Sequence, residues 1–172
     1  MFAREQLIVR PARSEDLGVL VQFSAAMALE TEGRRLEEDR LHHGTLAVLE
    51  SSVHGFYLVA EVRVESSSSV VGQLLVTYEW SDWRNARFWW IQSVYVHPDW
   101  RRRGVYRRMH EAVLGEAKTR GGICGVRLYV EGANAAAMAV YRRVGLALSP
   151  YRVFEDDFVL AKRDALLSRE ET

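Results

Sequence analysis

The sequence lacks the signals of a disulfide-bonded, a metal-binding or a membrane protein. Its single cysteine, Cys124, cannot form an intrachain disulfide, and no Cys/His cluster has the spacing of a zinc site. No apolar run approaches the roughly 18 residues of a membrane span, and residues 1–10 lack the apolar core of a signal peptide. We therefore expect a cytoplasmic protein with no metal and no membrane partner.

The chain also lacks net charge, since 23 Lys and Arg residues balance 23 Asp and Glu residues. A neutral protein has no overall field that attracts nucleic acid, so charge can act only where it is local. The length of 172 residues, with 48% apolar and 27% charged residues, is typical of one globular domain. We expect a single domain over residues 1–172, with residues 162–172 as a frayed tail.

Apolar periodicity predicts an α+β protein. Helices are expected at residues 17–27, 36–49, 105–116 and 133–144. Strands are expected at residues 7–9, 56–64, 70–78, 88–96, 126–130, 146–154 and 158–160. This order predicts a mixed, mostly antiparallel central sheet of about seven strands, flanked by about four helices in one layered architecture.

The most informative segment covers residues 94–106. It contains a β-branched strand, a proline turn, three arginines and a glycine, followed by residues with helical spacing. That order puts backbone N–H groups and guanidinium charge at the start of a helix, where anions are favoured. Asn134 and Tyr141 lie seven residues apart on the last expected helix. Together these features predict an enzyme that uses a phosphorylated acyl carrier.

These motifs resemble those of the GNAT acyltransferase superfamily. Its signature, Gln/Arg-x-x-Gly-x-Gly/Ala, is matched by residues 101–106, except that Tyr106 stands where the family has Gly or Ala. A later family pattern of strand, Asn, helix, Tyr and Gly is matched by Asn134, Tyr141 and Gly145. The resemblance implies the GNAT fold and an acetyl-CoA-dependent N-acetyltransferase. Its acceptor would be a primary amine of a small molecule or peptide, attacking directly in a ternary complex.

The resemblance also implies how acetyl-CoA is held. The backbone near Val94 would pair with the pantetheine arm, and the N–H groups after Arg101 would surround the pyrophosphate. The implied cofactor-binding residues are Val94, Tyr95, Val96, Arg101, Arg102, Arg103, Gly104, Val105, Tyr106 and Asn134. Two alternatives stay open: Asn134 could simply cap its helix, and the arginines could form an ordinary solvated basic face.

Tyr141 is the candidate general acid, because a positioned phenol can protonate the thiolate as it leaves. The general base is harder to name, since Trp90 occupies the place where some family members carry a glutamate. Glu79, at the end of the preceding strand, is the best acidic substitute, and Gln92 could hold a water molecule. The alternatives are a core tyrosine for Tyr141 and a solvated loop carboxylate for Glu79.

Acidic and aromatic residues predict an acceptor site for a cationic amine, through charge and cation–π attraction. The candidate residues are Glu30, Trp80, Trp83 and Gln92, with Glu32 and Asp82 beside them. The tryptophans could equally belong to the core or to a homodimer surface.

Two other functions remain open. One is a non-catalytic acyl-CoA sensor, which the missing family glutamate allows. The other is a nucleic-acid-binding module that uses the arginines of residues 101–108. The balanced charge and the lack of interleaved aromatic residues argue against this second function, so we expect no nucleic-acid partner.

Overall fold

The computed structural model describes residues 6–65 and 67–160 of the chain. The strands are β1 (Gln6–Pro11), β2 (Phe56–Val64), β3 (Ser67–Ser81), β4 (Ala86–Val96) and β5 (Ile123–Leu128). The α-helices are α1 (Leu17–Glu32), α2 (Glu38–Glu50), α3 (Val105–Thr119) and α4 (Ala135–Arg143). The predicted tail, residues 162–172, lies outside the described residues.

The chain divides into two compact units, Met1–Ala135 and Ala136–Thr172. The first unit contains the whole sheet and α1 to α3, and the second contains nearly all of α4 and the segment after it. That the chain is a single domain stays a prediction.

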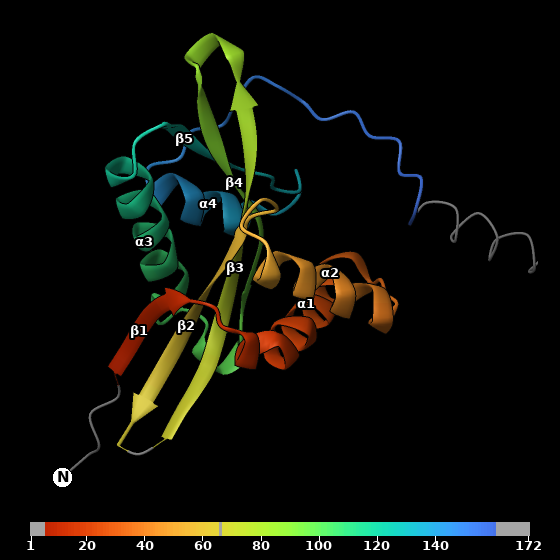
Figure 1. Ribbon diagram of the computed structural model, residues 1–172, viewed down its shortest axis with the longest axis vertical. Coiled ribbons are helices and arrows are strands. Elements are labelled where there is room, and N and C mark those ends of the chain that lie inside the picture. Colours follow the sequence, from red (N-terminus) through yellow and green to blue (C-terminus); the bar gives the residue numbers. More distant parts are fainter. Residues whose placement is uncertain (1–5, 66, 161–172) are drawn as a thin grey trace, which may run out of the picture. The chain divides into compact units, whose positions relative to one another are not determined.

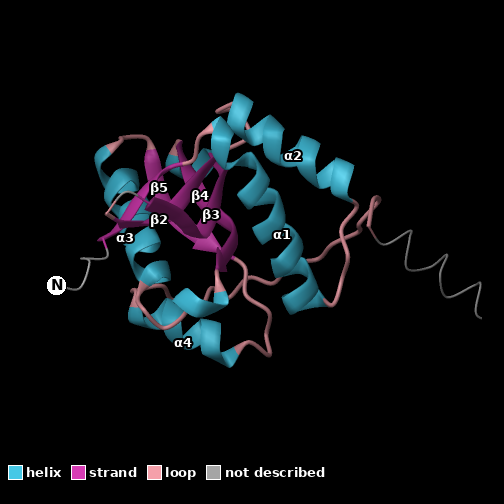
Figure 2. Cartoon of the chain, turned by 90° about the horizontal axis from the view of Figure 1, so that it is seen from below, coloured by secondary structure: helices cyan, strands magenta, loops and turns pink. Residues whose placement is uncertain are grey.

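One five-stranded sheet, in the order β1-β2-β3-β4-β5, forms the centre of the first unit (Figure 1). Neighbouring strands are antiparallel from β1 to β4, and β5 runs parallel to β4. The parallel pair requires a crossover connection, which α3 provides. Figure 2 shows the sheet with α3 on one side and with α1 and α2 on the other. The prediction of a mixed, mostly antiparallel sheet with four helices is confirmed.

The α3 face of the sheet carries the larger core, because the apolar residues of α3 recur at helical spacing. Val105, Met109, Val113 and Ala117 are all buried, and they pack against Leu58, Ala60, Val62, Val71, Leu74, Val76, Trp89 and Ile91. The helix ends before Gly121 and Gly122, whose φ angles of 65° and 67° lie in the left-handed region. This ending fits the predicted helix boundary.

The prediction of about seven strands is wrong by two, since the sheet has five. Residues 146–154 and 158–160 form no strand in the described chain. Pro150 has no N–H for a strand ladder. The Asp157 carboxylate accepts hydrogen bonds from the N–H groups of Val159 and Leu160 at 2.7 and 2.8 Å. Such local bonds favour a turn over an extended strand.

The connection between the strands expected at residues 70–78 and 88–96 is also shorter than predicted. β3 continues to Ser81, a short 3-10 helix covers Asp82–Arg84, and β4 begins at Ala86. Glu79 therefore lies in a strand, paired in register with Phe88. The last strand begins and ends earlier than expected, at Ile123–Leu128 rather than residues 126–130.

Candidate functional site

The edge of β4 that faces β5 is only partly covered. Pairing with β5 ends at Ile91 and Leu128, whereas pairing with β3 continues to Val96. His97 donates its N–H to a carbonyl of β3 at 2.9 Å. Because backbone groups alternate in direction along a strand, those of Val94 and Val96 point to the other side. No strand of the described chain pairs with them there, so an extended ligand has an edge to join.

A β-bulge lies next to this edge. The register between β3 and β4 shifts at Leu75, which leaves Gln92 as the extra residue of β4. The Gln92 side chain donates from Nε2 to Thr77 Oγ1 at 2.9 Å. Bulges are frequent beside active sites, where they redirect a strand. The structure therefore holds Gln92 in place through a neighbour on β3.

The turn between β4 and α3 has the backbone of an anion site. Arg102 and Gly104 adopt left-handed φ angles of 63° and 79°, and no side chain caps the start of α3. Alternation between left- and right-handed conformations directs successive N–H groups into one concavity. The positive end of the helix dipole adds to the attraction. A turn of this kind can bind an anion.

Arg101 joins this turn to the end of α1. Its Nη2 donates to Glu30 Oε2 at 2.6 Å, and its Nε donates to the carbonyl of Val96 at 2.9 Å. The Tyr95 hydroxyl donates to the other oxygen of Glu30 at 3.1 Å. The hydrogen bond from Arg101 lowers the pKa of Glu30. The structure thus brings together three cofactor candidates and one acceptor candidate.

Other arginines of the turn and of α3 also contact protein groups. The Arg103 guanidinium lies 4.8 Å from the centroid of the Trp100 ring, and Arg108 donates to the carbonyl of Leu7 at 2.7 Å. These contacts, with those of Arg101, argue against a uniform basic face for nucleic acid. The irregular motif residue Tyr106 lies along α3, with its hydroxyl 3.4 Å from His110 Nδ1.

Glu79 belongs to a second cluster, near the point where β4 and β5 separate. Its Oε1 accepts a hydrogen bond from Arg127 Nη1 at 2.8 Å, and its Oε2 accepts one from the Trp90 indole N–H. The ring of Tyr129 packs on Trp90 with the centroids 4.2 Å apart. Trp90 and Arg127 are paired one residue before the pairing ends. The carboxylate therefore lies beside Trp90, on the face of the sheet opposite buried Trp89.

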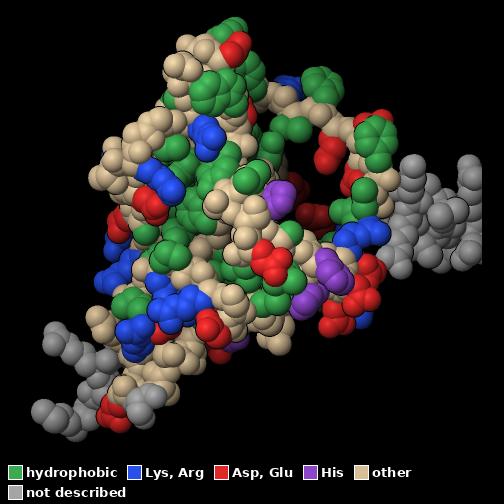
Figure 3. Space-filling view, viewed as in Figure 1, with side chains coloured by type: hydrophobic (Ala, Val, Ile, Leu, Met, Phe, Trp, Pro, Cys, Tyr) green, Lys and Arg blue, Asp and Glu red, His purple; other side chains and the backbone are tan. Residues whose placement is uncertain are grey.

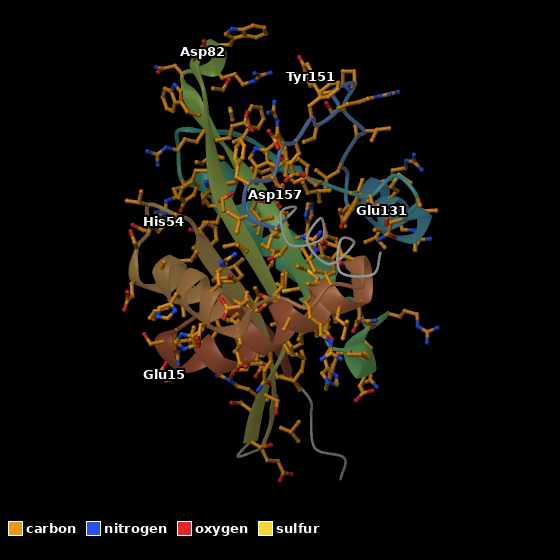
Figure 4. All side chains as sticks on the ribbon, turned by 90° about the vertical axis from the view of Figure 1, so that its right-hand side faces the viewer. Glu15, His54, Asp82, Glu131, Tyr151 and Asp157 are labelled. Atoms are coloured by element: carbon orange, nitrogen blue, oxygen red, sulfur yellow. The ribbon has the colours of Figure 1, made fainter. Side chains whose placement is uncertain are left out.

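The residues predicted to form the acceptor site do not lie together in the structure. Glu30 is bound at Tyr95, which pairs with Gln73, six residues before Glu79 on β3. Six residues of strand span about 20 Å. Trp80 follows Glu79 directly, so it points to the opposite face of the sheet. Figure 4 shows Asp82 at the tip of the β3–β4 hairpin, far from Glu15, which lies in the short 3-10 helix (Ser14–Asp16) before α1.

Tyr141 lies on α4, in the second unit. The helix ends at Arg143, one residue before the predicted end. Gly145 follows with a φ of 92°, and the N–H of Leu146 donates to the Tyr141 carbonyl at 3.0 Å. Burial raises the pKa of the Tyr141 phenol, so its hydroxyl stays protonated at neutral pH. In the first unit, Asn134 directly precedes α4, and its N–H donates to the carbonyl of Glu131 at 3.0 Å.

Comparison with known proteins identifies the family. A model described as the acetyltransferase (GNAT) family matches residues 23–146. The chain belongs to the GNAT acetyltransferase family. Membership supports acyl-CoA-dependent acetyl transfer as the general activity of this GNAT chain. No curated protein sequence matches it significantly.

Solved structures agree with the family. One, named as a possible acetyltransferase from Clostridium difficile 630, is 37% identical with a TM-score of 0.80, and the match covers 89% of this chain and 98% of that one. An aminoglycoside N-acetyltransferase in complex with CoA is 12% identical, with a TM-score of 0.71 and coverage of 90% and 97%. A ribosomal-protein-alanine N-acetyltransferase from Brucella melitensis is 15% identical, with a TM-score of 0.67 and coverage of 89% and 100%. The last two show the fold alone.

Sequence reasoning missed Arg127 and Tyr129 in this GNAT acetyltransferase. The Arg127 guanidinium lies 3.6 Å from the centroid of the Phe88 ring and also binds Glu79. Gly125 makes room for that ring, because an added Cβ would lie 2.7 Å from Phe88 Cε1. An arginine in a short, otherwise apolar strand was the available signal, since a half-buried charge requires a partner.

Residues 6–65 and 67–160 contain no group of three or more His, Cys, Asp or Glu residues that could hold a metal ion. None of their helices is long and apolar enough to cross a membrane.

Proposed function

We propose that the chain is an acetyl-CoA-dependent N-acetyltransferase that acetylates a primary amine of a small molecule or peptide. The observation that carries this proposal is the turn before α3, with left-handed Arg102 and Gly104 and an uncapped helix start. It lies directly after a strand whose outer edge is uncovered from Gln92 onward. A carrier with an anionic end and an extended amide-containing arm matches both features.

The backbone N–H groups of residues 101–106 would bind the pyrophosphate of acetyl-CoA, and the Val94–Val96 edge would bind its pantetheine arm. When bound, this cosubstrate supplies an acetyl group activated as a thioester. The backbone N–H groups of this edge would also polarise the acetyl carbonyl through a fixed dipole, which is effective because it needs no reorganisation. Alignment of amine and carrier in one ternary complex lowers the entropic part of the barrier.

Tyr141 is the proposed general acid. Its position in the family motif and its raised pKa support this role, because a protonated phenol can donate a proton to the leaving sulfur. Glu79 is the proposed base for the attacking amine. Arg127 and Trp90 bind one lone pair on each carboxylate oxygen, and each oxygen has a second lone pair that can accept a proton.

The acceptor is proposed as a small-molecule or peptide amine. The aminoglycoside enzyme and the ribosomal-protein-alanine enzyme share the fold, and one fold can serve many acceptors. The homodimer and the cytoplasmic location both stay predictions.

The first experiment measures thiol release from acetyl-CoA with a polyamine, an aminoglycoside, an amino acid and a peptide with a free N-terminus. With the best acceptor, Tyr141→Phe should lower kcat by about 10²–10⁴-fold, while acetyl-CoA affinity stays near the wild-type value. Tyr151→Phe is the matched control, because Tyr151 lies in the same unit and is exposed. Unchanged turnover in Tyr141→Phe removes this residue from the mechanism. Acetyl-CoA binding without turnover of any amine would instead indicate a sensor.

The second experiment tests Glu79. Glu79→Gln keeps a side chain of the same shape that cannot accept the proton, so kcat should fall by about 10²–10⁴-fold while acetyl-CoA affinity stays near the wild-type value. Glu131→Gln, an exposed carboxylate in the same unit, serves as the control. An unchanged kcat in Glu79→Gln would exclude Glu79 as the base and leave an ordered water in that role.

A further inference from the structure

A cavity of about 420 Å³ lies on the α3 face of the first unit, near the end of the β3–β4 hairpin. Its lining includes Tyr78 and Trp80 from β3, Arg87 and Trp89 from β4, and Arg120 from the turn after α3. Tyr78 and Trp80 flank Glu79 in sequence, so the cavity and the Glu79 cluster occupy opposite faces of the sheet. The volume is in the range of small-molecule sites.

The charge of this cavity is positive. It is lined by two arginines and by no carboxylate. Arg120 pairs with Glu116 Oε1 at 3.1 Å, whereas no carboxylate in the described part of the chain pairs with Arg87. The Arg87 guanidinium lies 5.7 Å from the centroid of the Tyr78 ring. One positive charge therefore remains uncompensated, which favours a singly charged anion.

The cavity also offers hydrogen-bond donors besides the guanidinium groups. Burial raises the pKa of Tyr78, although Arg120 and Arg87 act in the opposite direction. The Tyr78 hydroxyl is therefore protonated at neutral pH and can donate a hydrogen bond. Asn85 adds an amide group to the lining. This excess of donors over anionic acceptors is the composition expected around a carboxylate.

The aromatic part of the lining indicates a planar ligand. Trp89 is 1% exposed and belongs to the core below the cavity, whereas Trp80 is 58% exposed. Figure 3 shows hydrophobic side chains gathered at the end of this hairpin. The opposite wall contains Gly121 and Gly122, where an added Cβ would meet no atom within 4 Å. That wall is held to the sheet by a hydrogen bond from the Arg87 N–H to the Gly122 carbonyl at 2.9 Å.

We propose that this cavity binds a small aromatic carboxylate, with its carboxylate between Arg87 and Arg120 and its ring against Trp80. Guanidinium groups bind carboxylates with charge-assisted hydrogen bonds, and an exposed indole is a stacking surface for an aromatic ring. This site is distinct from the turn before α3 and from Glu79. The proposal therefore does not rest on the proposed acetyl transfer.

The test measures binding of 2-naphthoate and of its neutral counterpart, 2-naphthylmethanol, by ligand-observed NMR and calorimetry on the full chain. We expect naphthoate to bind, naphthylmethanol to bind at least several-fold more weakly, and Arg87→Gln to lower naphthoate affinity about tenfold or more. Trp80→Ala should also weaken binding. Arg84→Gln is the matched control, because Arg84 lies on the same hairpin and donates to Ser81 Oγ outside the cavity.

Three results would overturn the proposal: no binding of naphthoate at millimolar concentration, equal binding of the two compounds, or unchanged affinity in Arg87→Gln. Arg120→Gln replaces Arg87→Gln if that variant does not fold, as judged by circular dichroism, and it should weaken naphthoate binding as well. Acetyl-CoA affinity, measured in the same samples, should be unchanged in Arg87→Gln and in Arg120→Gln. Failure of the aromatic-carboxylate site is therefore distinguishable from failure of the acetyl-CoA site.

Discussion

The two faces of the central sheet differ in chemistry, although the same strands build both. On the α3 face, twelve buried apolar residues form one cluster, and His110 is the buried polar residue on α3. On the face covered by α1 and α2, the buried apolar cluster contains Leu20, Tyr57 and Val59. Buried polar residues on or beside that second face include Asp16, Ser24, Thr45, Glu61 and Gln73.

This difference assigns a separate role to each face: the α3 face stabilises the fold, and the opposite face fixes the position of α1. Apolar burial on the α3 face supplies most of the driving force for folding. On the opposite face, buried polar groups require specific partners, and each partner fixes an element in place. Gln73 of β3 donates to Ser24 of α1 at 2.8 Å, and Arg10 of β1 binds Asp16 and Glu61. These bonds hold α1, whose end carries Glu30, in a fixed position on the sheet.

The largest effect on stability is expected from removing a large side chain from the apolar core on the α3 face. Trp89 is 1% exposed and packs edge-on against Phe56, with ring centroids 5.0 Å apart. Trp89→Ala should lower the free energy of unfolding by about 3–5 kcal/mol, because it leaves a cavity in the core. Urea denaturation measures this loss. The control is Trp83→Ala, since Trp83 is 86% exposed and should change stability by about 0.5 kcal/mol or less. Equal losses in the two variants would contradict the assigned core.

A smaller effect on stability is expected from removing a buried charge on the face covered by α1 and α2. Glu61 is buried and binds Arg63 Nε at 2.6 Å as well as Arg10. Glu61→Gln should lower the free energy of unfolding by about 1–3 kcal/mol, because the partly buried Arg10 loses one charged partner. Arg63→Gln is the matched control, since its side chain is half exposed and the loss should be about 1 kcal/mol or less. If Arg63→Gln lowers the free energy of unfolding as much as Glu61→Gln does, the burial of Glu61 does not determine the size of the loss.

The same network predicts an acid-sensitive stability. Hydrogen bonds from Arg63 and Arg10 lower the pKa of Glu61 below 4.5. At Asp16, burial acts to raise the pKa, but bonds from Arg10 and the Arg13 N–H outweigh it and the pKa falls below 3.8. At pH values between the folded and unfolded pKa values of these groups, the unfolded chain therefore binds more protons than the folded chain. Both groups stabilise the fold fully above their unfolded pKa values, and this stability is lost as pH falls through the folded values.

Urea midpoints measured above and below pH 4.5, the ordinary pKa of Glu61, test this prediction. The wild-type midpoint should decline on acidification, and Glu61→Gln should decline less because one titrating group is gone. An identical decline in both proteins would show that Glu61 does not contribute to the acid response.

Local patterns predicted the elements that are proposed to bind acetyl-CoA, but not the contacts between distant residues. Alternation in β4 and helical spacing in α3 are properties of short windows, so both elements and the turn between them were predicted. The left-handed Arg102 was not, because only the closed turn imposes that backbone on a non-glycine residue. The partnership of Glu79 with Arg127 joins residues 48 positions apart and has no local signature.

Two sequence-based expectations differ from the structure, for different reasons. Trp80 was grouped with Glu79 by proximity in sequence, but adjacent residues of a strand face opposite sides of the sheet. The last two strands were predicted from aromatic and β-branched residues, a preference that context readily overrides. Exposed Tyr151 and Phe154 lie on this segment, which is not in a strand.

The smallest expected effect tests whether Glu30, at the end of α1, influences binding at the proposed acetyl-CoA site. The Arg101–Glu30 pair has side chains that are 44% and 42% exposed, so it contributes about 1 kcal/mol or less. Glu30→Gln removes the competing carboxylate and releases Arg101 to the pyrophosphate. Acetyl-CoA affinity should therefore rise, by up to about fivefold, which is the equivalent of 1 kcal/mol. Calorimetry at low ionic strength measures it, because salt screens such exposed charges.

A double-mutant cycle with Arg101→Gln isolates the coupling between the two residues. In the Arg101→Gln background, Glu30→Gln should no longer change acetyl-CoA affinity, because the guanidinium that it releases is gone. Glu32→Gln, two residues further along α1 and exposed, controls for the general loss of a negative charge near the site. A gain in affinity that persists without Arg101, or that Glu32→Gln reproduces, would mean that Glu30 acts through the local field and not through this ion pair.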